Sequence, residues 1–478
     1  MNDEKYTVVI IGGGITGITA AYYLQKAVKE RQLPIECKLV EATHRLGGKV
    51  QTVVRDGFVI ERGPDSFLAR KTSAFRLVRE VGLENEIVHN ATGKSYILAN
   101  GKLYPIPGGA IMGIPTQIGP FITTRLFSPL GKLRAAFDFI LPPTKVEGDL
   151  SLGQFFRRRL GDEVVDNLIE PLLSGIYAGD IDQMSLMATF PQFFQIEQKY
   201  GSLVLGAKRT APKAQKERKG AFQTLKTGLQ SLVDEVEKRM EQGSVIKGVR
   251  VERVWREGTG YRLRLSNGDI WKADSIIVAA PHSSVPAMFA DYPFFEPFQS
   301  IPSTSVATVA LAFPESAIEQ DIDGTGFVVS RRNDYTITAC TWTHKKWPHT
   351  APDGKALLRC YVGRPGDEEI VEQSDDEIVR VVMDDLSKIM RISGRPELIA
   401  ISRWKEAMPQ YTVGHKERLA KIKTHMDAEL PGVFLAGSSY EGLGLPDCID
   451  QGENAVKKVL DYLQTAPRKL AEVNSKMS

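Results

Sequence analysis

Residues 7–17 read Thr-Val-Val-Ile-Ile-Gly-Gly-Gly-Ile-Thr-Gly, and this run dominates the interpretation of the whole chain. The first five residues are largely apolar and predict a buried strand. The glycines that follow, at Gly12, Gly14 and Gly17, have the G-x-G-x-x-G spacing of a dinucleotide-binding turn. Gly12 would allow a sharp turn, Gly14 would let a pyrophosphate approach the backbone, and Gly17 would let the next helix pack on the strand. The N-terminus of that helix would offer N–H groups and a positive dipole end to phosphates.

A second strand is expected at Ile35–Glu41, and it ends in an acid. The Glu41 carboxylate can accept hydrogen bonds from ribose hydroxyls. Strand, turn, helix, strand and acid in this order form the setting in which the glycine spacing becomes specific. The dinucleotide-binding residues predicted here are Gly12, Gly13, Gly14, Ile15, Thr16, Gly17, Glu41 and Ala42. The alternative is a plain tight turn in an α/β domain.

The segment Arg45-Leu46-Gly47-Gly48-Lys49 indicates which dinucleotide binds. NAD-binding folds have no general need for a second glycine pair after the acid. Flavoproteins of the amine oxidase and phytoene desaturase type do use one, and this resemblance points to FAD. The glycines would let a second loop pass close to the cofactor, with Arg45, Gly48 and Lys49 around it. The alternative is a flexible turn before the next strand.

Composition places the chain among ordinary globular proteins. It has 478 residues, 42% hydrophobic and 25% charged, which suggests two or three domains. The net charge of +3 is too small to indicate nucleic-acid binding. The four cysteines lie far apart without a C-x-x-C pair, so neither a zinc site nor a disulfide framework is expected. The acidic start of the chain shows no signal peptide, and a cytoplasmic location is predicted.

One uncharged stretch, residues 103–124, has the length of a membrane span. It contains four prolines and four glycines, however, and a continuous helix is not expected at that density of helix breakers. We interpret it as an apolar loop that packs, lines a cavity or touches a surface. No transmembrane span is predicted.

The predicted fold class is α/β plus α+β. It has a Rossmann-like FAD-binding domain of the amine oxidase type, a mixed-sheet substrate domain and a helical insertion. The FAD-binding domain is assigned to residues 1–70, 220–297 and 431–478. The substrate domain is assigned to residues 71–97 and 298–430, and the helical domain to residues 98–219.

Three further segments, residues 61–67, 174–180 and 442–449, resemble the porphyrinogen oxidases. The similarity covers nearly the whole chain and is greatest to the soluble Bacillus-type enzymes, which act on coproporphyrinogen III. The resemblance implies a role in haem biosynthesis, in which FAD accepts hydrogen from the reduced macrocycle. Molecular oxygen would then reoxidise the flavin and yield hydrogen peroxide.

The same resemblance implies further contacts to the cofactor. Residues 63–66 would approach the flavin through their backbone, Val251 would cover the adenine, and the helix after Gly437 would reach the isoalloxazine ring. A helix N-terminus there would stabilise a reduced, negatively charged flavin, and we expect Asp447 to cap that helix. Cys448 is expected to be a packed cysteine. The full set is Gly63, Pro64, Asp65, Ser66, Val251, Gly437, Leu445, Pro446, Asp447, Cys448 and Ile449.

No catalytic side chain and no metal site are predicted, because the chemistry would be centred on the flavin. Lys71, Gly175 and Ile176 are the candidates for substrate binding. Arg157-Arg158-Arg159 carries more positive charge than Lys71, but we interpret this cluster as lying mostly on the surface. His344 and His349 could in principle bind a metal, and a solvated loop is favoured for them.

Several alternatives stay open. The substrate could be protoporphyrinogen IX instead of coproporphyrinogen III, and the enzyme could be a flavin amine oxidase or desaturase. A porphyrin-binding carrier is the alternative outside enzymes. Expected partners are the porphyrinogen and molecular oxygen, with transient membrane contact and handover of product to a ferrochelatase as further expectations.

Overall fold

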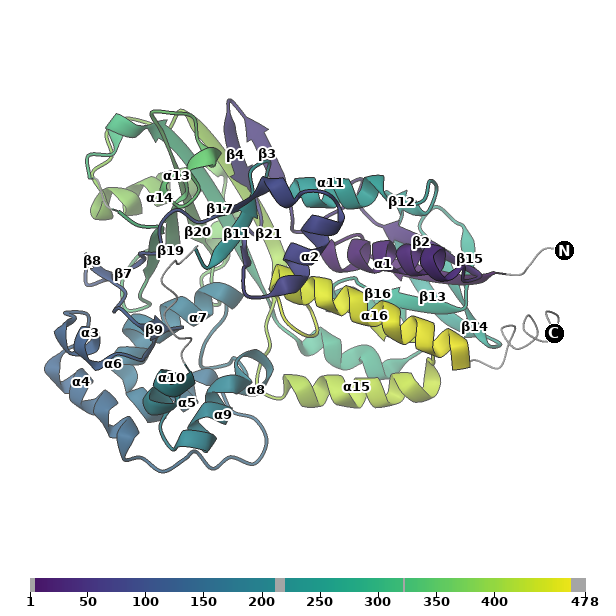
Figure 1. Cartoon of the computed structure of the whole chain (residues 1–478), viewed down its shortest axis with the longest axis horizontal. Coiled ribbons are helices and arrows are strands. Elements are labelled where there is room, and N and C mark those ends of the chain that lie inside the picture. Colours follow the sequence, from purple (N-terminus) through teal and green to yellow (C-terminus); the bar gives the residue numbers. More distant parts are fainter. Residues whose placement is uncertain (1–4, 211–219, 321–322, 466–478) are drawn as a thin grey trace.

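A parallel sheet of five strands forms the centre of one half of the protein (Figure 1). The computed structural model describes residues 5–210, 220–320 and 323–465. The strands run in the order β12-β2-β1-β16-β22, and all neighbouring strands are parallel. Their bounds are β1 Tyr6–Ile11, β2 Ile35–Glu41, β12 Val245–Lys247, β16 Ser275–Val278 and β22 Val433–Leu435. Three segments that are far apart in the sequence therefore build this one sheet.

Both faces of this sheet are covered. Because side chains alternate along a strand, Val8 and Ile10 point to one face and Val9 and Ile11 to the other. The first face packs against helices, and the second against a three-stranded antiparallel sheet and two helices. The helices are α1 Ile15–Arg31, α2 Thr72–Glu80, α11 Gln230–Lys238 and α16 Leu445–Thr465. The opposite cover consists of β13 Val251–Glu257, β14 Gly260–Leu265, β15 Ile270–Ala273, α12 Val285–Met288 and α15 His415–Glu429.

A second, seven-stranded sheet forms another part of the molecule, with the order β21-β17-β20-β19-β18-β7-β8. Its strands are antiparallel to their neighbours except for the pair β18 and β7. Helix α14 (Asp375–Ile389) packs on this sheet and is capped by the Ser374 hydroxyl. The strands are β7 Tyr96–Ala99, β8 Lys102–Pro105, β17 Ser303–Pro314, β18 Gly326–Val329, β19 Ile337–Trp342, β20 Lys355–Val362 and β21 Leu398–Pro409.

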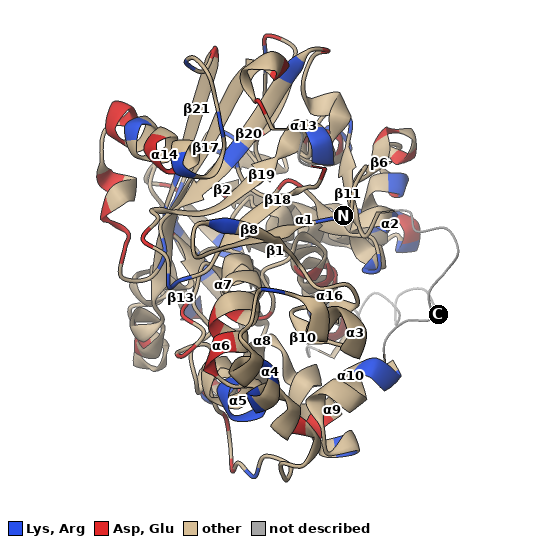
Figure 2. Ribbon diagram, turned by 90° about the vertical axis from the view of Figure 1, so that its left-hand side faces the viewer, with Lys and Arg blue, Asp and Glu red and all other residues tan. Residues whose placement is uncertain are grey.

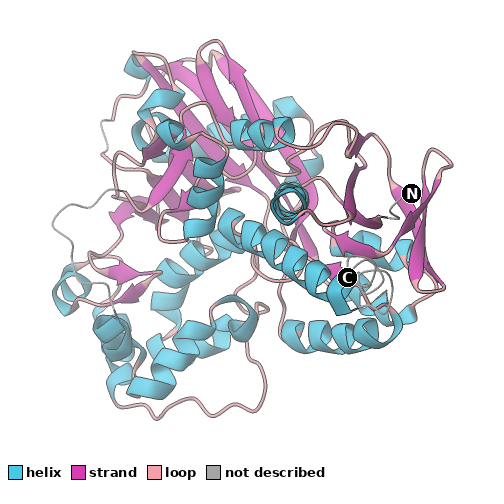
Figure 3. Cartoon of the chain, turned by 45° about the vertical axis from the view of Figure 1, so that its right-hand side comes forward, coloured by secondary structure: helices cyan, strands magenta, loops and turns pink. Residues whose placement is uncertain are grey.

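A helical region lies below this sheet in Figure 1, and Figure 3 shows how its helices are set apart from the strands. It has its own hydrophobic core, to which Phe155, Leu168 and Leu173 contribute fully buried side chains. The helices are α3 Ile118–Thr123, α4 Pro129–Ala136, α5 Leu152–Leu160, α6 Asp162–Val164, α7 Glu170–Tyr177, α8 Leu186–Thr189, α9 Pro191–Tyr200 and α10 Leu203–Thr210. A π-helix, Val165–Ile169, joins α6 to α7.

Short elements connect these parts. The hairpin of β3 (Thr52–Arg55) and β4 (Phe58–Glu61) leads to a small sheet in which β11 pairs with β5 and β6. Helix α13 (Thr343–Lys346) follows β19. The remaining strands are β5 Phe67–Leu68, β6 Ile87–His89, β9 Ala110–Ile111, β10 Ile114–Pro115 and β11 Phe222–Leu225.

The uncharged stretch 103–124 forms several short elements. It contains most of β8, the β9–β10 pair and α3, with prolines and glycines between them. None of the helices in the described ranges combines the length and the apolar composition needed to cross a bilayer.

The predicted fold class is confirmed, since a parallel dinucleotide-type sheet, a mixed sheet and a helical region are all present. The domain limits stay a prediction. Helix α2, which we had assigned with the substrate domain, packs into the core beside α1 and α16. Strands β7 and β8 extend the seven-stranded sheet across the predicted limit at residue 98.

The expectation that Arg157-Arg158-Arg159 is mostly surface is wrong for Arg159. Its side chain is fully buried, and its guanidinium donates to the Asp138 carboxylate at 2.6 Å and to several backbone carbonyls. Arg157 pairs with Asp166 and other acids of the region around α6, coloured red beside the blue of α5 in Figure 2. Burial of a charge is tolerated here because Arg159 is paired and fully hydrogen-bonded.

Candidate active site

The glycine turn after β1 has the geometry that a bound dinucleotide needs. Gly12 has φ of 104°, a conformation that L-residues rarely adopt. A Cβ on Gly17 would lie 1.8 Å from the Gly12 carbonyl oxygen, so α1 can approach the turn only without a side chain there. At Gly14 no atom of the described chain lies within 4 Å of such a Cβ. Gly14 therefore borders open space, as expected where a pyrophosphate approaches the backbone.

The second glycine pair lies directly beside this turn. The Gly47 N–H donates to the Gly13 carbonyl at 2.8 Å, and Gly14 and Gly47 form a parallel β-bridge. Gly48 has φ of 57°, and its Cβ would lie 3.1 Å from the Gly14 Cα. The two glycine-rich segments thus form one surface at the N-terminus of α1. Within the described residues no side chain caps α1, which leaves its first N–H groups available to a phosphate.

Glu41 ends β2 next to this surface. Its carboxylate accepts hydrogen bonds from the Gly13 N–H at 2.6 Å and from the N–H and hydroxyl of Thr43. A carboxylate has further lone pairs, so ribose hydroxyls can still bind to it. Ala42 is exposed beside it, and Val251 is buried at the start of β13.

Arg45 and Lys49 flank the second glycine pair. The Arg45 guanidinium donates to the carbonyls of Leu46, Gly48 and Val50, so it holds the loop in shape. Burial lowers the pKa of both side chains, and the nearby Cys448 opposes the shift at Lys49. An anion bound here would offset the cost of burying these two cations.

The C-terminal segment closes the site from the other side. Gly437 lies near the start of α1, where a Cβ would be 3.6 Å from the Thr16 hydroxyl oxygen. Helix α16 begins at Leu445, so Pro446, Cys448 and Ile449 occupy its first turns. Cys448 is buried, which raises the pKa of its thiol to about 11. A thiol of this kind is packed and unreactive.

Asp447 does not cap α16 in the expected way. It lies inside the first turn, and its carboxylate forms an ion pair with Lys71, the residue before α2. The carboxylate still lies at the positive end of the helix dipole, which stabilises it. Lys71 is thus brought to the site, but its ammonium group already has a partner.

The segment 63–66, predicted to face the flavin, is held mainly by the seven-stranded sheet. Asp65 accepts a hydrogen bond from Lys346 at 2.7 Å, and Arg359 donates to the Gly63 carbonyl. Burial alone would raise the pKa of the Asp65 carboxyl, but Lys346 and Arg359 outweigh it and hold the pKa well below its usual range. We call residues 62–66 the flavin loop.

The interpretation of His344 and His349 as a solvated loop is wrong. Their segment folds into α13 and a 3-10 turn, Trp347 is buried, and burial lowers the pKa of both histidines. Lys346 and Trp347 of this segment contact Asp65, and sequence reasoning missed them. Trp347, which follows two lysines and precedes a proline, was the available signal, because a large aromatic residue is seldom left in solvent.

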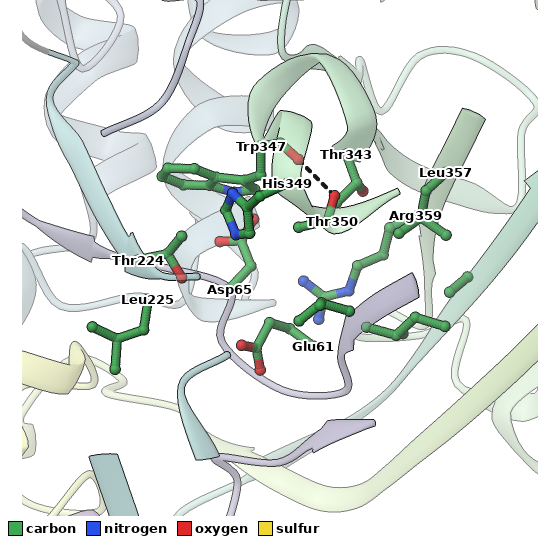
Figure 4. A pocket seen from close by; sticks show the side chains of 13 residues that line it. Glu61, Asp65, Thr224, Leu225, Thr343, Trp347, His349, Thr350, Leu357 and Arg359 are labelled. Carbon is green, nitrogen blue, oxygen red and sulfur yellow. Dashed lines mark hydrogen bonds between the residues drawn. The ribbon is translucent and has the colours of Figure 1, made fainter. Parts of the chain in front are cut away.

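A small cavity lies behind the flavin loop, shown in Figure 4. It has room for about one water molecule. Arg359 Nε and His349 Nε2 have no hydrogen-bond partner among the described residues. Glu61 also lines the cavity, and burial raises the pKa of its carboxyl to about 7. The cavity is too small for a substrate, and the side chains that line it pack behind the flavin loop.

The remaining substrate candidates lie at the end of α7. Gly175 and Ile176 are exposed, whereas Leu173 and Tyr177 on either side are buried. Burial and then the charge of Asp447 raise the pKa of Tyr177, which indicates that this end of α7 faces the N-terminus of α16. Lys71 pairs with Asp447, so Lys71 and the end of α7 both lie near the first turn of α16.

The described residues contain no group of three or more histidine, cysteine or acidic side chains placed to bind a metal. A dinucleotide fits the features that are present instead: two adjoining glycine turns, an uncapped helix N-terminus, an acid at the end of β2 and two partly buried cations. These features define a flavin-dependent oxidoreductase with a dinucleotide domain assembled from separate segments.

The chain belongs to the flavin-containing amine oxidoreductase family, whose model matches residues 15–460. FAD is its cofactor, and when bound it supplies the two-electron oxidation of the substrate. The chain is 56% identical over 468 residues to coproporphyrinogen III oxidase of Bacillus subtilis (strain 168), covering 97% of this chain and 100% of that protein. It is 46% identical to coproporphyrinogen III oxidase of Staphylococcus aureus (strain NCTC 8325 / PS 47), covering 96% and 99%.

Solved structures show the same architecture. A protein from Exiguobacterium sp. 255-15, proposed to be a protoporphyrinogen oxidase, superposes with a TM-score of 0.86 at 41% identity and covers 96% of this chain and 99% of that one. Putrescine oxidase bound to putrescine has a TM-score of 0.66 at 15% identity, covering 96% and 99%, and shares the fold alone.

Proposed function

We propose that this protein oxidises coproporphyrinogen III to coproporphyrin III in haem biosynthesis. The observation that carries this proposal is the 56% identity, over the full length, to a coproporphyrinogen III oxidase. Protoporphyrinogen IX is the alternative substrate, because it differs only in carrying vinyl groups where coproporphyrinogen has two of its propionates. Oxygen would reoxidise the cofactor and be released as hydrogen peroxide.

We assign the cofactor contacts to the residues predicted from the sequence. The two glycine turns and α1 would hold the pyrophosphate, Glu41 the ribose and Val251 the adenine. The flavin loop and the first turn of α16 would hold the flavin ring. Backbone N–H groups and the dipole of α16 would stabilise negative charge on the reduced ring.

The substrate would lie between Lys71, Gly175 and Ile176. Ile176 offers an apolar surface to the macrocycle, and the Gly175 carbonyl can accept hydrogen bonds from pyrrole N–H groups. Lys71 could bind a propionate only by exchanging Asp447 for it, since the two side chains are paired. No side chain needs to act as a base in this scheme, because the cofactor accepts the hydrogen.

Peroxide production by the purified, FAD-loaded protein tests the proposal. We expect kcat/KM for coproporphyrinogen III to exceed that for protoporphyrinogen IX by at least about tenfold. Equal or better use of protoporphyrinogen IX would overturn the substrate assignment. Bleaching of the flavin by amines and not by porphyrinogens would show an amine oxidase. Binding of porphyrin without bleaching would show a carrier.

We also propose that the protein works in the cytoplasm and passes its product to a ferrochelatase. The four cysteines are buried and unpaired, as is usual in a reducing compartment. To test direct transfer, the rate at which porphyrin appears in an added ferrochelatase is measured with and without a protein that traps free porphyrin. Equal rates with and without the trap would support transfer, and suppression by the trap would contradict it.

Transient contact with an anionic membrane is the last part of this proposal. Exposed apolar side chains gather on α3, α4 and the following 3-10 turn, with Leu130 78% and Ile140 75% exposed. In residues 118–145 the one acid, Asp138, is buried, so the exposed charges of this stretch itself are basic, and Glu163 adds a carboxylate at the start of α4. Apolar side chains surrounded by cations suit a negatively charged lipid surface.

Sedimentation with vesicles tests this contact. The protein should bind phosphatidylglycerol vesicles at low salt, and binding should fall at high salt and with neutral phosphatidylcholine. The double variant Leu130→Ser, Ile140→Ser should lose binding and keep its oxidase activity. A protein that ignores both kinds of vesicle, or forms a dimer through this face, would contradict membrane contact.

A further inference from the structure

Helix α7 brings the proposed substrate residues to the site by its last turn only. Ile176 is 50% exposed, and no atom of the described chain lies within 4 Å of a Cβ built on Gly175. The rest of the helix is buried in the helical core, with Leu173 fully inaccessible. The position of this turn depends on how the whole helix is held.

The backbone before α7 does not hold the helix rigidly by itself. Val165–Ile169 is a π-helix, a form that occurs mostly as single turns and often at functional sites. Pro171 lies in the first turn of α7 and has no N–H to donate. Contacts from outside the helix must therefore fix its register and direction.

Arg331, in the turn between β18 and β19, reaches both ends of α7. Its Nε lies 3.5 Å from Glu170 Oε1 at the first residue of the helix. Its Nη1 donates to Asp180 Oδ1 at 3.1 Å, just beyond the last residue. The chain reverses at Ala178, which has φ of 48°, and this reversal brings Asp180 back towards the same guanidinium.

The residues next to Arg331 contact the π-helix, and within the described part of the chain they form no hydrogen bond or ion pair with α7 itself. The Ser330 hydroxyl donates to the Asp166 carbonyl at 3.0 Å, and Arg332 Nε donates to Asp166 Oδ2 at 2.8 Å. Helix α7 also packs on β18 and β19. The turn 330–332 thus connects the seven-stranded sheet to this segment by polar contacts, and Gln410, directly after β21, adds a hydrogen bond to the Tyr177 carbonyl at 2.9 Å.

The ion pair between Arg331 and Glu170 stabilises a carboxylate that is buried. Glu170 is buried, and burial raises the pKa of its carboxyl to about 7. Arg331, the Ser174 hydroxyl and Arg364 favour the ionised form, while Asp166 disfavours it. Arg331 is the largest of the favourable influences, so its removal would leave a poorly compensated buried acid.

We propose that Arg331 is a positioning residue, which clamps both ends of α7 and so sets the distance of Gly175 and Ile176 from the bound macrocycle. The inference rests on the proposed function, because it takes these two residues to face the substrate. Arg331 touches neither substrate nor cofactor in this scheme. It acts through the helix, and a small displacement of a positioning element can be costly in rate.

Kinetics of Arg331→Met, Arg331→Lys and Arg332→Met in the FAD-loaded protein test this role. We expect Arg331→Met to lower kcat/KM for coproporphyrinogen III by about tenfold, mostly through KM. Arg331→Lys keeps the charge but can reach only one end of α7, so it should recover part of the loss. Arg332→Met removes a contact to the π-helix alone and is the matched control, expected to stay within about twofold.

The absorption spectrum of the bound FAD and its dissociation constant should be the same in all variants. Equal losses in Arg331→Met and Arg332→Met, or a loss caused by weaker FAD binding, would overturn the assignment. If Arg331→Met does not fold, Asp180→Ala removes one end of the clamp and should raise KM by an intermediate factor. An unchanged KM in that variant would equally overturn it.

Amide hydrogen exchange separates this inference from the proposed function. Residues 170–180 should exchange faster in Arg331→Met than in the wild type, whatever the substrate proves to be. Faster exchange without any turnover of porphyrinogens would support the positioning role of Arg331 and contradict the proposed function. Unchanged exchange would sink the clamp even if the enzyme oxidises coproporphyrinogen III.

Discussion

A methyl group added at Gly14 and one added at Gly17 meet different surroundings. At Gly14 it points into open space at the predicted pyrophosphate position, and at Gly17 it overlaps the Gly12 carbonyl at 1.8 Å. We therefore expect Gly14→Ala to keep the stability of the apoprotein and to raise the FAD dissociation constant by at least about tenfold. Gly17→Ala should instead lower the free energy of unfolding by about 3 kcal/mol.

Urea unfolding of the apoproteins and fluorescence titration with FAD measure these two effects separately. Gly17→Ala serves as the control for Gly14→Ala, because both add one methyl group to the same turn. If Gly14→Ala binds FAD as the wild type does, the pyrophosphate does not lie where the sequence predicts it.

Glu61 should make stability depend on pH. Its carboxylate accepts hydrogen bonds from the Leu229 N–H and the Thr52 hydroxyl, yet burial raises its pKa to about 7. The folded protein therefore binds this proton more tightly than the unfolded chain, in which the pKa is about 4.3. The contribution to stability is complete below about pH 4.3 and is lost as the pH rises through 7.

Glu61→Gln should remove this dependence. At pH 4 the variant and the wild type should be equally stable, and at pH 8 the variant should be more stable by about 3 to 4 kcal/mol. Urea unfolding of both proteins at the two pH values checks this. A variant that is less stable than the wild type at both values would show that the charge itself is needed.

At the residue scale, the sequence correctly predicted the relative positions of residues that belong to one motif of fixed spacing. Gly12, Gly14 and Glu41 lie together as expected because a turn of fixed length places them. The partners of Lys71 and Asp447 could not be predicted, since they are 376 residues apart and meet only through tertiary packing.

Helix α5 offers two neighbouring arginines in opposite surroundings. Arg159 is fully buried against Asp138, and Arg158 is partly exposed and bonds to the Thr144 hydroxyl. We expect Arg159→Met to lower the free energy of unfolding by about 4 kcal/mol, because it leaves the buried carboxylates of Asp138 and Glu197 without this cation. Arg158→Met is the matched control and should cost less than about 1 kcal/mol.

Thermal unfolding followed by circular dichroism measures both variants. Similar small effects would mean that backbone N–H groups alone satisfy Asp138. Restoration of stability in the double variant Arg159→Met, Asp138→Leu would confirm that the unpaired carboxylate causes the loss.

At the scale of elements, strands with alternating or apolar runs were predicted closely. The strands around residues 261–265 and 270–273 and the turn between them appear as β14 and β15. The segment 343–350 was predicted wrongly because its charged residues, Lys345 and Lys346, indicated a solvent-exposed loop. Tertiary contacts to Asp65 decide its structure, and no local pattern reports them.

At the scale of the whole molecule, the seven-stranded sheet and α13, which follows β19, hold the flavin loop in place. Lys346 pairs with Asp65 where both side chains are largely buried. We expect Lys346→Met to weaken FAD binding by about tenfold, although Lys346 lies in the predicted substrate domain, because a buried carboxylate without its cation distorts the loop. Fluorescence of FAD released on dilution gives the dissociation constant.

Lys355→Met is the control for this variant, since Lys355 pairs with Glu397 near the surface of the same sheet. It should change neither FAD affinity nor stability by a measurable amount. Loss of stability in Lys346→Met with unchanged FAD affinity would show that the flavin loop does not touch the cofactor.

The split arrangement of the FAD-binding sheet was predictable from the sequence, because each of its three segments contains an apolar strand. The orientation of the helical region was not. It depends on charged contacts such as Arg331 with Asp180, which link segments without any shared pattern.

The order of strands in the five-stranded sheet has a consequence for synthesis. Strand β1 lies in the middle of the sheet, but its neighbour β16 and the edge strand β22 are made much later. At about 5–20 residues per second, a ribosome needs on the order of 20–80 s to proceed from β2 to β22. Until β16 is made, the nascent chain exposes the apolar edge of β1, and until β22 is made it exposes the edge of β16, which makes it a client for chaperones. Loading of the cofactor is then one of the last events in the maturation of the protein, since α16 is among the last elements to leave the ribosome.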